Sequence, residues 1–179
     1  MFEQLALEPV LSRPDLVPTG ITELLKHWQG TVPASEVLVT PIDPEFAGSA
    51  EFCEKYQVPG GLGANCVVVE AVRGDNRFLA ACLVPISTRA DLNKTVRKLL
   101  DVRRVSFAPL EEVLQVTGME YGGITPVGLP NTFRILIDAR VAALDRLIIG
   151  GGYRKSKLLV PGKFLAELPH AQVVEGLGV

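Results

Sequence analysis

The segment Tyr121–Pro130 most constrains the fold, because it can form neither a helix nor a central strand. Gly122 and Gly123 can adopt backbone angles that side chains forbid, whereas Pro126 and Pro130 lack amide donors and fix φ. A loop of this kind leaves peptide N–H groups that can bind the oxygen of a carbonyl or carboxylate. An ordinary tight turn between a helix and a strand has the same composition, so the loop alone leaves both interpretations open.

The composition indicates a soluble globular protein with one hydrophobic core. The chain has 179 residues, of which 47% are hydrophobic and 21% charged, which is far from the composition of disordered proteins. No apolar run approaches the roughly 20 residues that cross a bilayer, and the N-terminus lacks the basic and apolar regions of a secretory signal. Cys53, Cys66 and Cys82 form no CxxC pair, so we expect a reduced, cytoplasmic chain.

The charge distribution argues against a protein that coats nucleic acid non-specifically. The formal net charge is −2, which still allows a local contact with a few phosphates. Two groups of basic residues stand out: Lys94, Arg97, Lys98, Arg103 and Arg104, and then Arg154, Lys155 and Lys157. A solvated surface is the ordinary explanation for both groups.

Hydrophobic spacing and turn residues predict an alternation of helices and strands. Helices are predicted over residues 21–28, 49–57, 91–100, 109–116 and 161–168. Strands are predicted over residues 36–40, 65–72, 77–84, 103–107, 133–138, 145–149 and 157–160. Because one pair of strands flanks a tight turn while others are separated by helices, the sheet should be mixed. We therefore expect an α/β fold, a single domain with a curved, mixed (parallel and antiparallel) sheet surrounded by helices.

The sequence offers no metal ligands at a recognisable spacing and no common nucleophile motif. His27 and His170 have no acidic partner nearby in sequence, and there is neither a Gly-x-Ser-x-Gly elbow nor a P-loop. Cys66 and Cys82 lie in apolar strands and should be inert, and Cys53 has no apparent base partner. We therefore expect no metal and no cofactor.

Three polar or flexible features remain, each at the end of a predicted element. They are the loop Gly122–Pro126, Asp138 at the end of a strand, and the turn Gly150–Gly152. Binding and catalytic groups are often carried by such strand ends. Asp138 has a second explanation, because it would also cap a short helix that starts at Ala139.

These features carry a family resemblance. Residues 117–130, with the sequence TGMEYGGITPVGLP, resemble the signature of the YbaK family, which includes free-standing aminoacyl-tRNA deacylases and the editing domain of bacterial prolyl-tRNA synthetases. Other segments resemble further parts of the family pattern: Ser49–Val58, Asp91–Leu100, Ile135–Asp138, Leu144–Asp145 and Ile148–Arg154. We accordingly divide the chain into an N-terminal extension with one amphipathic helix (1–34), a YbaK-like editing domain (35–168) and a C-terminal tail (169–179).

The resemblance implies an α/β fold and hydrolysis of the ester that joins a wrong amino acid to the terminal ribose of tRNA. In such enzymes a Gly-x-x-x-Pro element binds the aminoacyl end. The substrate-binding residues implied here are Gly122, Gly123, Thr125, Pro126, Gly151 and Arg154. Asp138 would orient a polar group or the attacking water, and Gly151 would let the backbone approach the ribose.

One position departs from the family. Its deacylases carry a lysine in the first core strand, whereas this chain has Asn65 there. A neutral amide can hydrogen-bond the substrate but offers no charge to a phosphate. Arg154 or Lys155 could supply that charge. We assign Asn65 and Asp138 as the catalytic residues.

We therefore expect a trans-acting aminoacyl-tRNA editing hydrolase. Its partner would be the acceptor end of an aminoacyl-tRNA, with no DNA and no membrane, and a homodimer is left open. One alternative is a binding module that kept the pocket but lost catalysis and holds an aminoacyl end, a nucleotide or a protein partner. Another is a hydrolase of small esters or amides. All three require Asn65, Gly122–Pro126, Asp138 and Gly151 to meet in one pocket.

Overall fold

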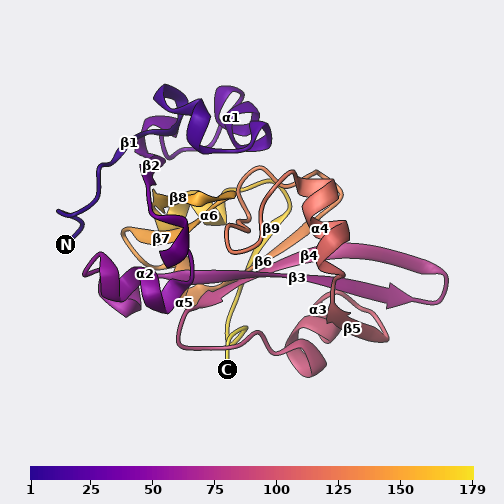
Figure 1. Ribbon diagram of the computed structural model, residues 1–179. Helices are drawn as coiled ribbons and strands as arrows, with labels where there is room; N and C mark the ends of the chain where they lie inside the picture. Colours follow the sequence, from indigo (N-terminus) through magenta and orange to yellow (C-terminus); the bar gives the residue numbers. More distant parts are fainter.

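The strands form two sheets in the computed structural model, which describes residues 1–179 (Figure 1). The first sheet is antiparallel and has the order β1 (Glu8–Pro9), β2 (Leu38–Pro41), β8 (Tyr153–Val160), β7 (Leu147–Gly151). The second has the order β5 (Arg104–Phe107), β3 (Ala64–Arg73), β4 (Asn76–Pro85), β6 (Arg134–Asp138), β9 (Ala171–Val174). It is mixed, because β3 pairs antiparallel with β4 and β5, whereas β6 pairs parallel with β4 and β9.

Helices surround the sheets, as the sequence predicts, so the expected α/β fold with a mixed sheet is confirmed. They are α1 (Thr19–Lys26), α2 (Ser49–Lys55), α3 (Arg97–Leu99), α4 (Leu110–Thr117), α5 (Ala139–Ala142) and α6 (Gly162–Ala166). A π-helical turn precedes α3 at Leu92–Val96, and α4 ends at Gly118, whose φ of 68° suits glycine. None of these helices has the length and apolar character that a bilayer crossing requires.

Both ends of the chain are built into the sheets. The strand β9, in the predicted tail, pairs with β6, and Val174 and Leu177 of this segment are buried. At the other end, β1 pairs with β2. Neither strand is predicted from the sequence, because both are short and their pairing partners lie far away along the chain.

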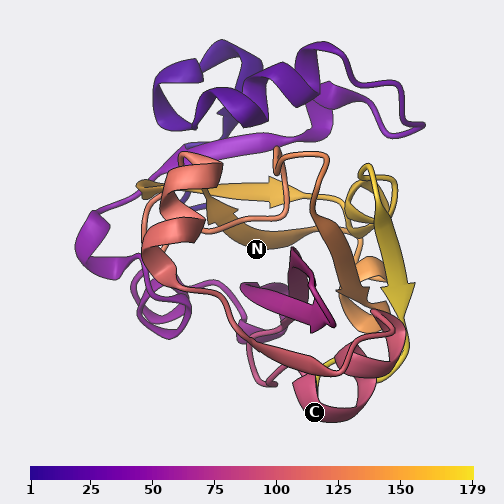
Figure 2. The same ribbon diagram turned by 90° about the vertical axis from the view of Figure 1, so that its right-hand side faces the viewer.

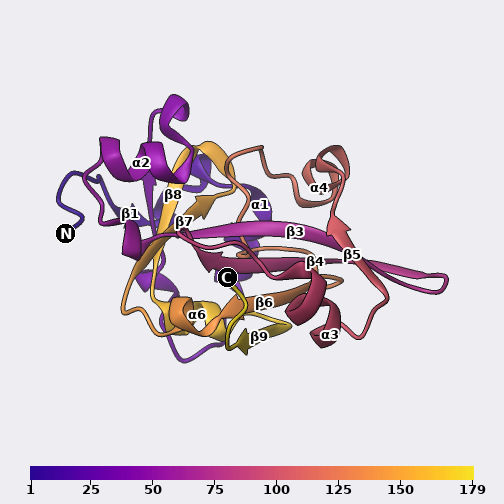
Figure 3. The same ribbon diagram turned by 90° about the horizontal axis from the view of Figure 1, so that it is seen from below.

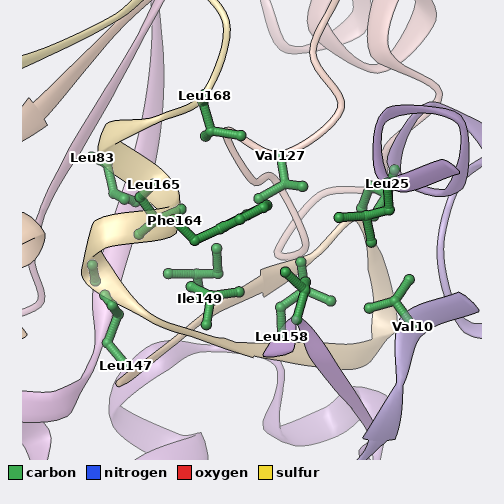
Figure 4. Close-up of a cluster of buried hydrophobic side chains, with 14 of the residues drawn as sticks. Val10, Leu25, Leu83, Val127, Leu147, Ile149, Leu158, Phe164, Leu165 and Leu168 are labelled. Carbon is green, nitrogen blue, oxygen red and sulfur yellow. The ribbon is translucent and has the colours of Figure 1, made fainter. Parts of the chain in front are cut away.

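The largest hydrophobic core lies between the sheets and includes the N-terminal segment (Figure 4). Its buried members come from every part of the chain and include Val10, Leu25, Leu83, Val127, Leu147, Ile149, Leu158, Phe164 and Leu165. The indigo segment with α1 therefore covers one side of the antiparallel sheet rather than extending away from it (Figure 1).

The long hairpin β3–β4 is covered by different helices on its two faces (Figures 2 and 3). Val69 and Ala71 pack with Val96 on the face of the π-helical turn and α3, whereas Val68 packs with Val113 of α4 on the other face. Neighbouring residues of a strand point to opposite faces, so α3 and α4 lie on opposite sides of the hairpin. Lys94, Arg97 and Lys98, which belong to the π-helical turn and α3, are therefore on the far side from α4.

Candidate functional site

A cavity of about 930 Å³ opens where α2, the start of β3, α4 and the loop after α4 meet. In Figure 3, α2 and α4 lie near opposite ends of β3 on the same side of it, and the loop runs between them. The polar groups of its wall that matter for chemistry belong to Ser49, Asn65, Gly122, Ile124, Arg154 and Lys157.

Asn65 lies in the cavity wall, as predicted. Its side chain is half-buried, and its Oδ1 accepts a hydrogen bond from the Ser49 hydroxyl at the start of α2. No protein atom accepts a hydrogen bond from its Nδ2 group. Because an amide nitrogen carries two N–H bonds, Asn65 can offer both to a bound molecule.

The glycine loop places the residues on either side of Gly123 at the cavity wall. The Gly123 N–H is used within the protein, where it donates to the Glu120 carbonyl at 3.0 Å. Gly122 and Ile124 line the cavity, and neither amide donates to an acceptor in the protein. Gly122 has a φ of 83°, a conformation that favours glycine.

Gly123 and Gly151 have a packing role, which the sequence did not reveal. The Gly152 N–H donates to the Gly123 carbonyl at 2.7 Å, and a Cβ on Gly123 would lie 2.6 Å from the Gly152 carbonyl oxygen. Gly151 is buried against Ser156, and neither Gly123 nor Gly151 lines the cavity. The two glycine segments are thus pressed together and form a rigid wall behind Gly122 and Ile124.

Thr125 and Pro126 also lie outside the cavity wall. Both are buried, and the Thr125 hydroxyl has no hydrogen-bond partner. Pro126 borders a separate cavity of about 310 Å³. Of the predicted Gly-x-x-x-Pro element, Gly122 and Ile124 are therefore at the wall of the large cavity, and Gly123, Thr125 and Pro126 are not.

Asp138 does not join the cavity, which corrects the expectation that it meets Asn65 there. Its buried carboxylate accepts hydrogen bonds from the Arg140 backbone (2.9 Å), the Arg140 guanidinium (2.8 Å) and the Gly178 N–H (2.8 Å). Burial alone would raise its pKa, but these hydrogen bonds and the Arg140 charge lower it overall. Asp138 caps α5 and fastens the C-terminal segment, which is the alternative explanation given above.

Arg154 is at the cavity wall, as predicted. Its guanidinium donates to the carbonyls of Tyr121 (3.2 Å) and Pro44 (3.0 Å), and it lies 5.9 Å from the centre of the Tyr121 ring. It therefore ties the glycine loop to the segment before α2. Lys155 is exposed and does not line the cavity, so it cannot supply the charge suggested for it.

Lys157 is the site residue that the sequence analysis missed, since it was grouped with surface residues. Only 4% of it is exposed, and its Nζ donates to the Ala47 carbonyl at 2.7 Å. Burial lowers its pKa to about 8. One feature of the sequence indicated this burial, because Lys157 is the first residue of the predicted strand 157–160. In the structure this strand belongs to β8, which lies between β2 and β7, where side chains are covered.

The cysteine thiols and the possible metal ligands are not arranged for nucleophilic attack by a thiolate or for binding a metal ion. Burial raises the pKa of the Cys66 thiol, which borders the cavity, and of the Cys82 thiol. His27 and His170 are exposed, and no three His, Cys, Asp or Glu side chains gather where they could hold a metal ion. The cavity wall is largely apolar, and the donors on it without a protein acceptor belong to Asn65, Lys157 and the backbone of Gly122 and Ile124.

Residues 43–168 match the aminoacyl-tRNA editing domain family. The chain belongs to this family. This editing domain is 33% identical over 90 residues to a proline–tRNA ligase from Bacillus licheniformis, which is 49% of the chain. The matched region is only 15% of the ligase.

Solved structures share the fold of this editing domain. A hypothetical protein and a candidate trans-editing enzyme for prolyl tRNA synthetase each have a TM-score of 0.70 and 21% identity to it. Both comparisons cover 89% of this chain, with 99% and 97% of the respective relative. The resemblance found in the sequence is thereby confirmed at the level of family and fold.

Proposed function

We propose that this editing domain hydrolyses the ester bond of a mischarged aminoacyl-tRNA, acting in trans in the cytoplasm. The observation that carries the proposal is the set of unpartnered donors around the cavity. They come from the Asn65 amide and from the backbone N–H groups of Gly122 and Ile124, on segments far apart in sequence. Membership of the aminoacyl-tRNA editing domain family supports the choice of an aminoacyl-tRNA ester as the substrate.

The donors suit the chemistry of an activated ester. Attack by water places negative charge on the carbonyl oxygen, and fixed N–H groups stabilise that charge without having to reorganise. A bound ester held beside a positioned water gains further from proximity. Neither a serine triad nor a metal is needed for such a reaction.

The mouth of the cavity suits the end of a nucleic acid. Phe107 and Tyr121 border the cavity and are 70% and 64% exposed. Exposed aromatic rings stack on nucleobases, which contributes about 1–3 kcal/mol per base. Arg154 adds a positive charge beside Tyr121. None of the basic residues around α3 lines the cavity, so they are not part of this mouth.

The test is a deacylation assay with tRNAs that carry Ala, Cys, Ser or Pro. We expect turnover of at least one substrate, and a threefold to tenfold lower rate for Asn65→Ala, because one hydrogen bond of about 0.5–1.5 kcal/mol is lost. Free aminoacyl esters serve as a comparison, since a small-ester hydrolase would cleave them equally well. No turnover of any charged tRNA would contradict the proposal and favour the binding module, for which Asn65 in place of the family lysine is the supporting observation.

A further inference from the structure

Lys157 differs from the other charged residues of the cavity in its burial. Glu45 and Glu51 at the cavity wall are exposed and Arg154 is half-buried, whereas Lys157 is 4% exposed. Burying an ammonium group is unfavourable unless it is paired, so a lysine at such a place requires an explanation.

The protein itself does not neutralise this ammonium. No carboxylate lies within salt-bridge distance of Lys157, and its only hydrogen bond is the one to the Ala47 carbonyl. Its Nζ also lies 5.6 Å from the centre of the Phe52 ring. An ammonium carries three donors, so two remain without a protein acceptor on a residue that lines the cavity.

The position of Lys157 is fixed relative to Asn65. Lys157 binds the carbonyl of Ala47, and the amide of Asn65 accepts from the hydroxyl of Ser49. Two steps along a chain span at most about 7 Å, so one short segment holds both groups. The cation and the amide therefore occupy the same end of the cavity.

We propose that Lys157 is a catalytic residue, whose ammonium group binds the carbonyl oxygen of the aminoacyl ester and stabilises the charge that develops there. The inference rests on the proposed function. Water adds its oxygen to the carbonyl carbon and the bond to the ribose oxygen breaks. The proton lost by the water ends on that ribose oxygen, and Lys157 keeps its own protons throughout.

The pH dependence distinguishes this role from general-base catalysis. Burial lowers the pKa of Lys157 to about 8, while Cys53 of α2 acts to raise it and Arg154 to lower it. Glu45 and Glu51 are the other charged groups at the wall. We expect the rate, corrected for spontaneous hydrolysis, to fall as the pH rises through about 8, because the ammonium is lost. A neutral amine acting as a base would give a rate that rises through the same range.

The experiment compares single-turnover deacylation by the full chain and by Lys157→Met, Lys157→Arg and Lys163→Met, on the best substrate of the tRNA panel. Removing one donor to a developing oxyanion lowers kcat about 100-fold or more, and we expect this for Lys157→Met. Lys157→Arg should retain more activity and move the pH-dependent fall upward. Lys163 is exposed on α6, outside the cavity wall, and serves as the matched control.

The outcomes separate the two proposals. If the wild type is active and the rate of Lys157→Met lies within threefold of the wild-type rate, the proposed role of Lys157 is wrong but the proposed function stands. A wild-type rate that rises through pH 8 leads to the same conclusion. No turnover by the wild type on any charged tRNA would overturn both. If Lys157→Met fails to fold, Lys157→Gln and the pH profile of the wild type give the same decision.

Discussion

The buried Lys157 should make the stability of the protein depend on pH in an unusual direction. Its pKa is about 8 in the folded chain and 10.5 ordinarily. Between these values the unfolded chain holds a proton that the folded chain has released, so the free energy of unfolding contributed by this group rises with pH. Below pH 8 both states are protonated and the destabilisation is complete.

We therefore expect Lys157→Met to be more stable than the wild type at pH 7, by about 1–3 kcal/mol, because an apolar side chain of similar size replaces a buried charge. The gain should shrink as the pH approaches 10. Urea unfolding of both proteins between pH 7 and pH 10 measures it. A variant less stable than the wild type at pH 7 would mean that Lys157 supports the fold rather than a bound substrate.

Asp138 should contribute to the stability of the fold rather than to catalysis. Hydrogen bonds hold its pKa below the usual value despite burial, so its contribution is present above about pH 4 and is lost as the pH falls through the folded-state pKa. We expect Asp138→Asn to lower the free energy of unfolding at pH 7 by about 1.5–3 kcal/mol, the range of hydrogen bonds to charged groups. Thermal unfolding of Asp138→Asn and the wild type measures this loss. Asp145→Asn, a substitution of the same kind at an exposed position, is the control. Loss of turnover at unchanged stability would instead restore Asp138 to the catalytic residues.

At the scale of elements, the two glycine segments behave as one unit. A Cβ on Gly123 would lie 2.6–2.8 Å from backbone atoms of Gly152 and Tyr153, which cannot move aside as a side chain can. We expect Gly123→Ala to cost about 1–3 kcal/mol through overpacking, and Gly123→Val more. Gly61→Ala, where a Cβ meets no atom within 4 Å, should be neutral or slightly stabilising. Equal stability of Gly123→Ala and the wild type in urea would show that the segments are not tightly packed.

The elements that the sequence predicts are those with a local signal. Apolar spacing gave the helix at 21–28, and the turn at 73–76 gave the hairpin β3–β4. The strand β9 has no such signal, because it exists only through parallel pairing with β6, more than thirty residues earlier. Asp138 was ambiguous for the same reason, since its partner Gly178 lies 40 residues away.

At the scale of the whole molecule, the site depends on contacts that no short segment encodes. The sequence singled out Asn65 and the glycine loop, but not that Lys157 reaches the same cavity, because its partner Ala47 is 110 residues away. The two groups of basic residues also differ in a way that the sequence does not reveal. Those near α3 do not line the cavity, whereas Arg154 and Lys157 do, and the sequence alone does not distinguish the two groups.

We propose above all that this cavity receives the aminoacylated end of a tRNA. The direct measurement is an NMR titration of the protein with a 3′-aminoacylamino-adenosine, whose amide replaces the ester and resists hydrolysis. We expect saturable shifts of the backbone amides of Gly122 and Ile124 and of the Asn65 side-chain NH₂ group. Shifts confined to the neighbourhood of Pro126 or Asp138, or no saturable shifts at millimolar ligand, would contradict the account.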